Sequence, residues 1–176
     1  GSRSEEGVVR SVDLGAKHST PYSLVFDDKG LYYNCKSESG IEYLLNNYNI
    51  KDDTDLLNKA REALDVLNKL KISKYNPVVF TKNNSFTIRR KVLVLGQIDS
   101  DASLKYGNPN RYTFDQVVLL AKQENPDADI IYRPHPEIYE GYKTSKIDLE
   151  FIESFAYIIS PKTHISDFIE DFDHVY

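Results

Sequence analysis

The sequence is poor in residue types that mark several classes of protein. Its 176 residues include one cysteine, no methionine and no tryptophan. Because Cys35 has no second thiol to pair with, a disulfide within the chain is excluded, and a reducing, cytoplasmic compartment is expected. No apolar run approaches the ~20 residues of a membrane-spanning helix, and no secretory signal is present. A net charge of −5 argues against a nucleic-acid-binding surface.

Motifs for bound phosphate and bound metal are missing as well. Gly96 stands alone, so neither a GxGxxG fingerprint nor a Walker-type phosphate loop occurs. His18, His164 and His174 have no partners at metal-ligand spacing, and there is no cysteine cluster. We therefore predict neither a metal site nor a bound cofactor.

Two stretches in the second half of the chain have the composition of buried parallel strands that end at a polar rim. The first has five apolar or small residues, Val92 to Gly96, followed by five polar ones: Gln97, Asp99, Ser100, Asp101 and Ser103. The second runs from Ala128 to Pro136 and ends in Arg-Pro-His-Pro. Ligands of open α/β sheets collect at the carboxyl ends of such strands. We therefore expect the two strand ends to form the floor of one site.

The N-terminal part predicts a small hairpin and a short helix. Tyr22 to Asp27 and Leu31 to Asn34 have strand composition and flank a turn at Asp28-Lys29-Gly30. Gly40 to Asn47 has apolar residues on one helical face, with Ser37 or Ser39 available as the cap.

Longer helices and further strands follow. The longest helix begins at Asp52-Asp53-Thr54, because leucine and alanine then recur at helical spacing as far as Leu70. A second helix begins at Thr113, where Gln116 completes a capping box. After the Arg-Pro-His-Pro strand we expect a polar loop from Ile138 to Lys146. The remaining expected elements are a strand within Phe155–Ser160, a short helix over Ile165–Phe172 and a strand starting at Val175.

Together these elements predict the α/β class, with a Rossmann-like three-layer domain around a central parallel sheet. We expect residues 1–77 to form a hairpin and helical segment packed on the core, and residues 78–176 to form the Rossmann-like core. Gly1-Ser2 has the form of an expression remnant, and the chain stops where an apolar strand is starting. Both ends indicate a piece of a larger molecule.

Asp99 and Asp101 are candidates for chemistry because a carboxylate beyond a strand end can act as nucleophile, base or ligand. The alternative interpretation is loop solvation together with a helix cap, and spacing alone does not separate the two aspartates. His135 is the stronger candidate, since prolines on both sides hold it extended and imidazole moves protons near neutral pH. Arg133 can bind a phosphate or a carboxylate. A structural histidine at an exit turn is the alternative there.

The sequence resembles the retaining β-Kdo glycosyltransferases of bacterial capsule polysaccharide biosynthesis. The resemblance lies in Gln97-Ile-Asp-Ser-Asp101-Ala-Ser followed by Arg133-Pro-His-Pro, and it extends to Glu6-Gly-Val-Val-Arg10-Ser. The segments Ser23 to Tyr33 and Ser73 to Asn76 also match the family's pattern, in the same order. Val8 departs from it, because the family has a bulkier residue there, and Arg133 replaces a frequent lysine.

The resemblance implies one half of a GT-B-like enzyme that transfers Kdo from CMP-Kdo to a Kdo-containing glycolipid acceptor with retention of configuration. It makes Asp101 the nucleophile, with Gln97 orienting it or the sugar, and His135 the acid/base or phosphate partner. Arg133 then offsets negative charge, and Ser103, Glu6 and Arg10 contact sugar or acceptor. No metal and no cofactor beyond the donor substrate is implied.

The resemblance also implies that the nucleotide-binding half of the module lies beyond this chain, so the chain by itself is expected to be inactive. Its partners would be the nucleotide-sugar donor, the Kdo-lipid acceptor and that missing half. The expected location is the cytoplasm, at the inner face of the inner membrane, where the full-length protein could associate peripherally. Three alternatives remain open: a CMP-sialic acid transferase, a teichoic-acid-type glycerophosphotransferase and a non-catalytic binding half-module.

Overall fold

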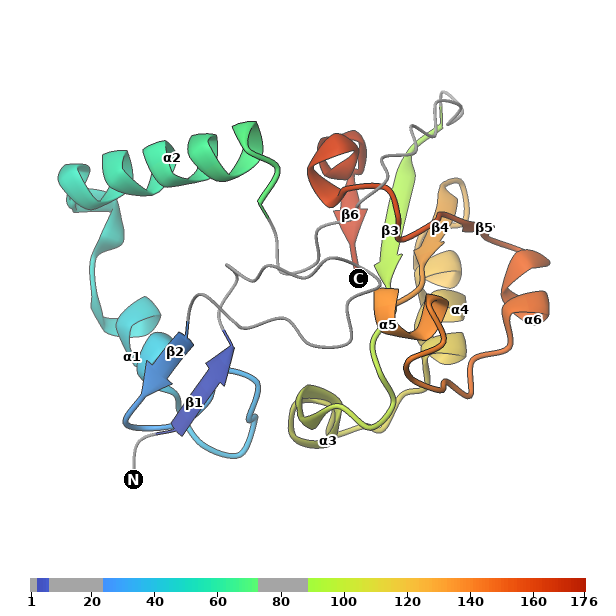
Figure 1. Ribbon diagram of the computed structural model, residues 1–176, viewed down its shortest axis with the longest axis horizontal. Helices are drawn as coiled ribbons and strands as arrows, with labels where there is room; N and C mark the ends of the chain where they lie inside the picture. The colour runs from blue at the N-terminus through green and yellow to red at the C-terminus, as the bar shows by residue number, and fades with distance from the viewer. Residues whose placement is uncertain (1–2, 7–23, 73–88) are drawn as a thin grey trace. The chain divides into compact units, whose positions relative to one another are not determined.

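The computed structural model describes residues 3–6, 24–72 and 89–176, with only the backbone for residues 3–6 (Figure 1). The predictions for Arg10, for the Ser73–Asn76 motif and for the side chain of Glu6 lie outside the described residues. Contacts divide the chain into two compact units. Unit 1 comprises Gly1–Asn76 with Lys105–Pro109, and unit 2 comprises Pro77–Leu104 with Asn110–Tyr176. The predicted division into domains at residue 77 stays a prediction.

Unit 1 contains a two-stranded antiparallel sheet. Strand β2 (Leu24–Asp27) confirms the strand predicted there, but its partner is β1 (Arg3–Glu6), with Arg3 opposite Asp27. The predicted return strand over 31–34 is wrong, because the chain makes turns in that segment. The Asp27 carboxylate accepts hydrogen bonds from the N–H groups of Lys29, Gly30 and Gly40, at 2.8 to 3.0 Å. These bonds fold the chain back toward the following helix instead of into a hairpin.

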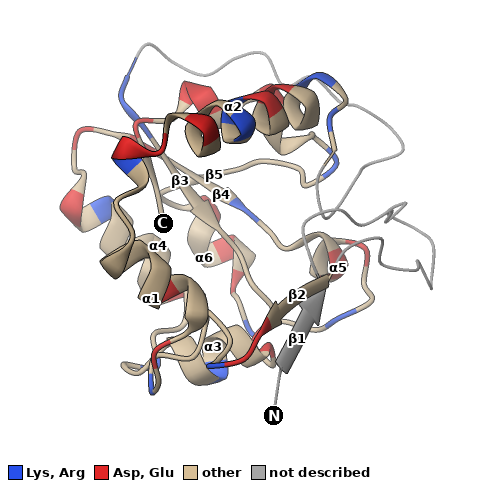
Figure 2. Ribbon diagram, turned by 90° about the vertical axis from the view of Figure 1, so that its left-hand side faces the viewer, with Lys and Arg blue, Asp and Glu red and all other residues tan. Residues whose placement is uncertain are grey.

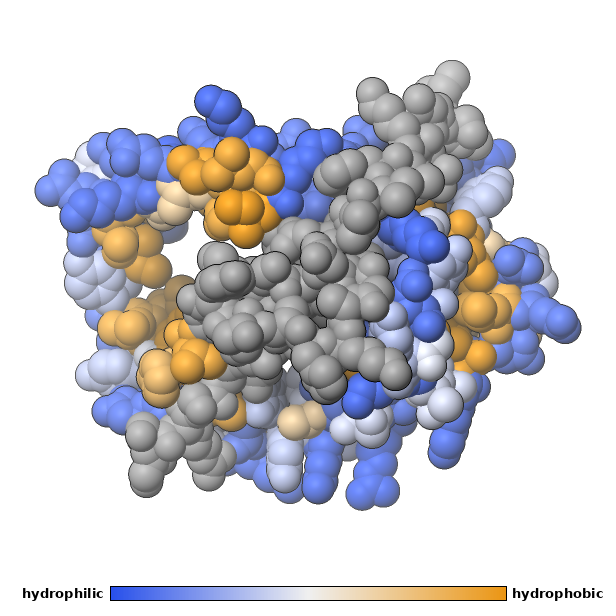
Figure 3. Space-filling model, in the orientation of Figure 1, coloured by the Kyte–Doolittle hydropathy of each residue, from blue (hydrophilic) through white to orange (hydrophobic). Residues whose placement is uncertain are grey.

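Both helices predicted for unit 1 are confirmed. Helix α1 (Gly40–Asn47) is capped by Ser39, and Glu42 completes a capping box, whereas α2 (Thr54–Lys69) is capped by Asp53. A single 3₁₀ turn, η1 (Ile50–Asp52), precedes α2. Neither helix contains a buried residue, and hydrophobic side chains are visible on the surface over α2 (Figure 3). Charged residues also line α2 along its length (Figure 2).

Unit 2 is built on a four-stranded sheet in which every pairing is parallel. The strands are β3 (Lys91–Leu95), β4 (Asp129–Arg133), β5 (Tyr157–Ile158) and β6 (His174–Val175), in the order β5-β4-β3-β6. The predicted α/β class with a central parallel sheet is therefore confirmed. Valine, leucine and isoleucine fill the middle of β3 and β4 because both faces of these strands are buried.

The helices in the second half of the chain agree with the sequence in part. Helix α4 (Phe114–Glu124) begins at the predicted Thr113–Gln116 capping box. The expected helix at 165–172 is two 3₁₀ turns, η2 (Ile165–Asp167) and η3 (Ile169–Asp171). Three short helices were not expected: α3 (Ala102–Gly107), α5 (Pro136–Tyr139) and α6 (Leu149–Glu153). The polar loop predicted from Ile138 is thus partly helical.

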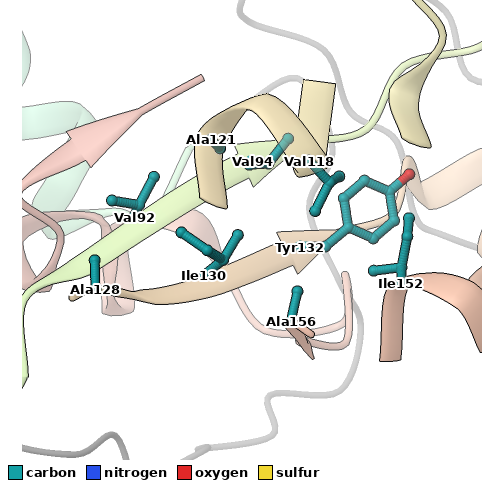
Figure 4. Close-up of a cluster of buried hydrophobic side chains, with 9 residues drawn as sticks. All are labelled: Val92, Val94, Val118, Ala121, Ala128, Ile130, Tyr132, Ile152 and Ala156. Carbon is teal, nitrogen blue, oxygen red and sulfur yellow. The ribbon is translucent and has the colours of Figure 1, made fainter. Parts of the chain in front are cut away.

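The core of unit 2 has two parts, one on each face of the sheet. On one face, α4 and α6 contribute Val118, Ala121 and Ile152, which pack on β3 and β4 (Figure 4). On the other face, Phe168 and the partly buried residues of η2 and η3 pack on Leu93 and Ile131. Among the described helices, none combines the length and the apolar composition of a membrane span.

Candidate functional site at the carboxyl end of the sheet

The strand order identifies the edge of the sheet where a ligand site is expected. The chain passes from β3 to β4 and β5 on one side, then returns to place β6 on the other side of β3. The direction in which successive strands are added to the sheet therefore reverses at β3. In open α/β sheets, ligands bind outside the carboxyl ends of the strands at such a point. The segment that leaves β3 begins with Gly96 and Gln97. It therefore occupies the position where the fold favours a site.

A network of hydrogen bonds fixes the segment after β3. The Gly96 N–H donates to the Arg133 carbonyl oxygen at 2.8 Å, which continues the β3–β4 pairing by one residue. Ile98 is buried, and the Asp101 N–H donates to its carbonyl oxygen at 2.9 Å. The Asp101 carboxylate is exposed and accepts from the Ser103 N–H at 2.8 Å, at the start of α3. Asp101 is therefore both a helix-start acceptor and an accessible carboxylate.

Asp99 is held differently from Asp101. Its Oδ2 atom accepts a hydrogen bond from the backbone N–H of Lys146 at 2.8 Å, which ties the loop to a distant segment of unit 2. The two aspartates that spacing alone could not separate thus have different neighbours. Asp99 joins two loops, whereas the described bond of Asp101 is local.

His135 is buried at the end of β4, where it caps α5. Its Nδ1 accepts a hydrogen bond from the Glu137 N–H at 3.2 Å. Because an accepting Nδ1 carries no proton, the neutral imidazole has its proton on Nε2. In this form of the ring, Nε2–H acts as a hydrogen-bond donor. The prolines on both sides set the extended backbone that makes this cap, as the sequence indicated.

Arg133 spans from β4 to the segment that follows β5. Its Nη2 donates to the carbonyl oxygens of Pro161 and Thr163, at 2.9 and 3.0 Å, and its guanidinium lies 5.8 Å from the centre of the Phe168 ring. Its Nε is buried and has no hydrogen-bond partner among the described residues. Burial lowers the pKa of Arg133 to about 10, so the side chain remains charged at neutral pH.

His164 was excluded as a metal ligand by sequence reasoning, and its structural role was missed. It is 2% exposed, its Nδ1 lies 2.7 Å from Ser166 Oγ, and that nitrogen accepts from the Ser166 N–H. Its backbone angles, φ −66° and ψ 135°, match the −62° and 135° of His135. The available signal was a histidine shortly after each of two neighbouring strands.

The structure places five of the seven predicted site residues in unit 2. Gln97 and His135 each lie two residues beyond a paired position, because Leu95 is opposite Arg133. Asp101 follows on the loop after β3, and Ser103 lies in the first turn of α3. Glu6 is described only as backbone of β1 in unit 1, and Arg10 is not described, so their part in a site stays a prediction.

This edge of the sheet is a polar site with an exposed carboxylate, a buried imidazole and a partly buried guanidinium. No group of three or more histidine, cysteine or acidic side chains lies close enough to hold a metal ion within the described ranges. Carboxylate and imidazole at neighbouring strand ends suit nucleophilic and acid/base chemistry.

Comparison with known proteins identifies a matching family and several similar proteins. Residues 78–175 match the family described as capsule polysaccharide biosynthesis protein. The lipopolysaccharide-processing protein LpsZ of Rhizobium meliloti is 34% identical over 176 residues, 99% of this chain and 40% of that protein. The capsule polysaccharide modification protein LipA of Neisseria meningitidis serogroup B is 37% identical over 154 residues, 88% of this chain and 22% of that protein.

Two solved structures resemble the chain over nearly its whole length. One is Thermosulfurimonas dismutans KpsC, beta Kdo 2,4 transferase, with a TM-score of 0.75 and 31% identity. The other is the beta Kdo 2,7 transferase of the same protein, with a TM-score of 0.70 and 27% identity. The matches cover 98% and 99% of this chain but 54% and 49% of those chains. The chain therefore spans about half of the solved chains it matches.

Proposed function

Because the chain belongs to the family of capsule polysaccharide biosynthesis proteins, we propose that it is part of a glycosyltransferase that transfers Kdo from CMP-Kdo. The acceptor would be a Kdo-containing glycolipid of capsule assembly. The observation that carries the proposal is the match of 98% of the chain to a solved beta Kdo transferase, at a TM-score of 0.75. The site residues in unit 2 supply the chemistry that such a transfer needs.

Asp101 is the proposed nucleophile. A donor with a β-linked leaving group and a product with a β linkage require retention, which two successive displacements provide. In the first, a carboxylate oxygen of Asp101 bonds to the anomeric carbon as the bond to the phosphate oxygen of CMP breaks. In the second, the acceptor hydroxyl displaces Asp101 and loses its proton. The exposure of Asp101 and its place beyond β3 support this role.

His135 is the proposed phosphate partner. Its Nδ1 accepts from the Glu137 N–H, so its neutral ring would donate a hydrogen bond from Nε2–H to the departing phosphate and keep that proton. CMP would leave as a phosphate anion, and a phosphate oxygen of CMP would accept the proton of the acceptor hydroxyl. Arg133 would add positive charge near the strand edge through its partly buried guanidinium, while its Nη2 supports the 161–163 segment. Gln97 would orient Asp101 or bind the sugar.

Binding of the donor and acceptor would use further parts of the protein. Ser103, Glu6 and Arg10 are proposed to contact sugar or acceptor. Since the chain spans 54% and 49% of the matching solved chains, we propose that the nucleotide is bound by a second, GT-B-like half and that these 176 residues are inactive alone. The proposed location is the cytoplasmic side of the inner membrane, where the glycolipid acceptor would be met.

A donor panel tests the proposal on the complete polypeptide in which this sequence occurs. CMP-Kdo, CMP-sialic acid and CDP-glycerol are each offered with a synthetic Kdo-bearing glycolipid, and product is followed by mass spectrometry. Transfer from CMP-Kdo alone is expected. Transfer from CMP-sialic acid or CDP-glycerol in its place would replace the proposal with one of those activities, and binding without any transfer would favour a non-catalytic module.

A further inference from the structure

Tyr132 and Gly96 meet at the end of β3 in a way that the proposed chemistry does not yet use. Tyr132 lies on β4 opposite Val94 and is 1% exposed. Its ring packs beside Val118 and Ile152, and its hydroxyl points out of the hydrophobic cluster (Figure 4). A buried phenol directed toward a strand end is a polar group that the packing of the core does not by itself require.

Gly96 provides the space that the phenol occupies. A Cβ atom added at residue 96 would overlap the Tyr132 hydroxyl and would lie 3.0 Å from its Cζ and 3.1 Å from the Arg133 carbonyl oxygen. Among the described glycines only Gly141 has a positive φ. Gly96 is therefore required by the volume of Tyr132 and not by its own backbone conformation.

The phenol end lies among groups that fix the same loop. Burial, followed by the charges of Asp115 and Asp99, raises the pKa of Tyr132 well above its ordinary value, so the hydroxyl keeps its proton. Asp99 in turn accepts from the Lys146 N–H, and Asp115 accepts from the Asp148 N–H at 3.2 Å. The Tyr132 side chain therefore lies where three segments meet: the loop after β3, the start of α4 and residues 146–148.

We propose that Gly96 and Tyr132 are a matched pair of positioning residues that sets the place of the Gln97–Asp101 loop, and with it the Asp101 carboxylate, beyond β3. The inference rests on the proposed function for the role of Asp101. Gly96 is bonded to β4 through Arg133 and lies five residues before Asp101. A side chain at residue 96 must either expel the phenol from the core or lift the start of the loop. A displacement of ~1 Å in a catalytic group can lower a rate by about 100-fold.

Five variants of the complete polypeptide test the pair: Gly96→Ala, Tyr132→Phe, the Gly96→Ala/Tyr132→Phe double variant, and, as matched controls on an exposed residue of β5, Tyr157→Phe alone and combined with Gly96→Ala. For Gly96→Ala we expect kcat for Kdo transfer to fall by about 100-fold, with KM for the donor nearly unchanged. Removing the hydroxyl should recover most of that loss, so the double variant should approach Tyr132→Phe. Combining Gly96→Ala with Tyr157→Phe should recover nothing.

Two outcomes would overturn the pairing: unchanged kcat in Gly96→Ala, or equal losses of kcat with and without the Tyr132 hydroxyl.

Amide hydrogen exchange separates failure of the pair from failure of the proposed function. In the 176-residue chain, Gly96→Ala should speed exchange at the Asp101 and Lys146 N–H groups, which bond within the loop and to Asp99. The double variant should restore it. If the wild type transfers no Kdo but the double variant restores slow exchange, the pairing of Gly96 with Tyr132 is supported and the enzyme assignment fails. If the double variant does not restore slow exchange, the pairing is rejected.

Discussion

Asp99 accepts a hydrogen bond from the backbone N–H of Lys146 at 2.8 Å, between residues 47 positions apart in the sequence. This bond joins the loop after β3 to the segment before α6. Asp101, two residues on, makes its described bond to the neighbouring Ser103 N–H. The two carboxylates that the sequence presents as equivalent are therefore expected to respond differently to substitution.

Asp101→Asn should abolish Kdo transfer while leaving the free energy of unfolding within ~0.5 kcal/mol of the wild type. Asparagine can still accept from the Ser103 N–H, since it is as good a helix-start acceptor as aspartate, but its amide does not form the covalent sugar adduct. Transfer is measured with CMP-Kdo in the complete polypeptide, and stability by urea unfolding of this chain. Near-normal turnover in this variant would remove Asp101 as nucleophile.

Asp99→Ala is the matched comparison. It removes the acceptor for the Lys146 N–H, so unfolding should become easier by about 1 kcal/mol. The measurement is again urea unfolding of the chain. Equal stability of Asp99→Ala and the wild type would show that the inter-loop bond contributes nothing, and the proposed division of roles would lose its physical basis.

His135 offers a pair of variants that separates its two nitrogens. Asparagine places an acceptor near the position of Nδ1 and can keep the bond from the Glu137 N–H, whereas glutamine reaches toward the position of Nε2 and loses that cap. We expect His135→Asn to be more stable than His135→Gln by ~1 kcal/mol. Transfer should be lost in the asparagine variant, because no group remains at Nε2.

Thermal unfolding and single-turnover transfer check both halves of this prediction. The structural interpretation of His135, as a cap and nothing more, makes the opposite forecast: activity would follow stability, and the asparagine variant would be the more active. A full rate in His135→Asn would therefore reassign the residue to structure.

Local signals in the sequence predicted much of this fold. The Thr113–Gln116 capping box forms as expected, and Ser39, one of the two predicted cap candidates, caps α1, because a cap is satisfied by backbone groups within three residues. The apolar runs of β3 and β4 predicted a buried parallel pair, since only strands covered on both faces tolerate such composition. The helices α3 and α6 were missed because each is shorter than two turns and has no hydrophobic periodicity to detect.

Features that depend on distant residues could not be predicted in this way. The partner of β2 is a strand at the start of the chain, which turn chemistry at Asp28-Lys29-Gly30 does not reveal. Arg133 was expected at a substrate anion, yet its Nη2 donates to two carbonyl oxygens about thirty residues later in the chain. The packing of Tyr132 over Gly96 is likewise a property of strand register, and residue type alone does not encode it.

Arg133→Lys should destabilise unit 2 by about 2 kcal/mol, although it keeps the positive charge. An ammonium group cannot reproduce the planar guanidinium that donates to the Pro161 and Thr163 carbonyl oxygens while it lies against Phe168. Urea unfolding of the chain measures the loss. If Arg133 also binds the donor, KM for CMP-Kdo should rise in the same variant; an unchanged KM together with lower stability would restrict Arg133 to support of the 161–163 segment.

Asp27 should make unit 1 sensitive to acid. The pKa of Asp27 lies below its ordinary value of 3.8, mainly because its carboxylate accepts a hydrogen bond from the Gly30 N–H. Hydrogen bonds from the N–H groups of Lys29 and Gly40 lower it further. A carboxyl group with a lowered pKa in the folded state stabilises that state at pH values above its unfolded pKa, and the contribution is lost as pH falls through the folded pKa. Unfolding should therefore become easier below about pH 4.

Asp27→Asn provides the control, because it keeps one acceptor oxygen at the turn but cannot titrate. At pH 6 the variant should be less stable than the wild type, since the neutral amide accepts more weakly from the three N–H groups. As the pH falls through the lowered pKa of Asp27 and the wild-type carboxylate is protonated, the difference in unfolding free energy between the two proteins should shrink toward zero. Urea unfolding followed by far-ultraviolet circular dichroism at pH 6 and at successively lower pH values measures it, because α1 and α2 supply helical signal from unit 1. A difference that stays constant with pH would mean that the charge of Asp27 plays no part in holding the turn before α1.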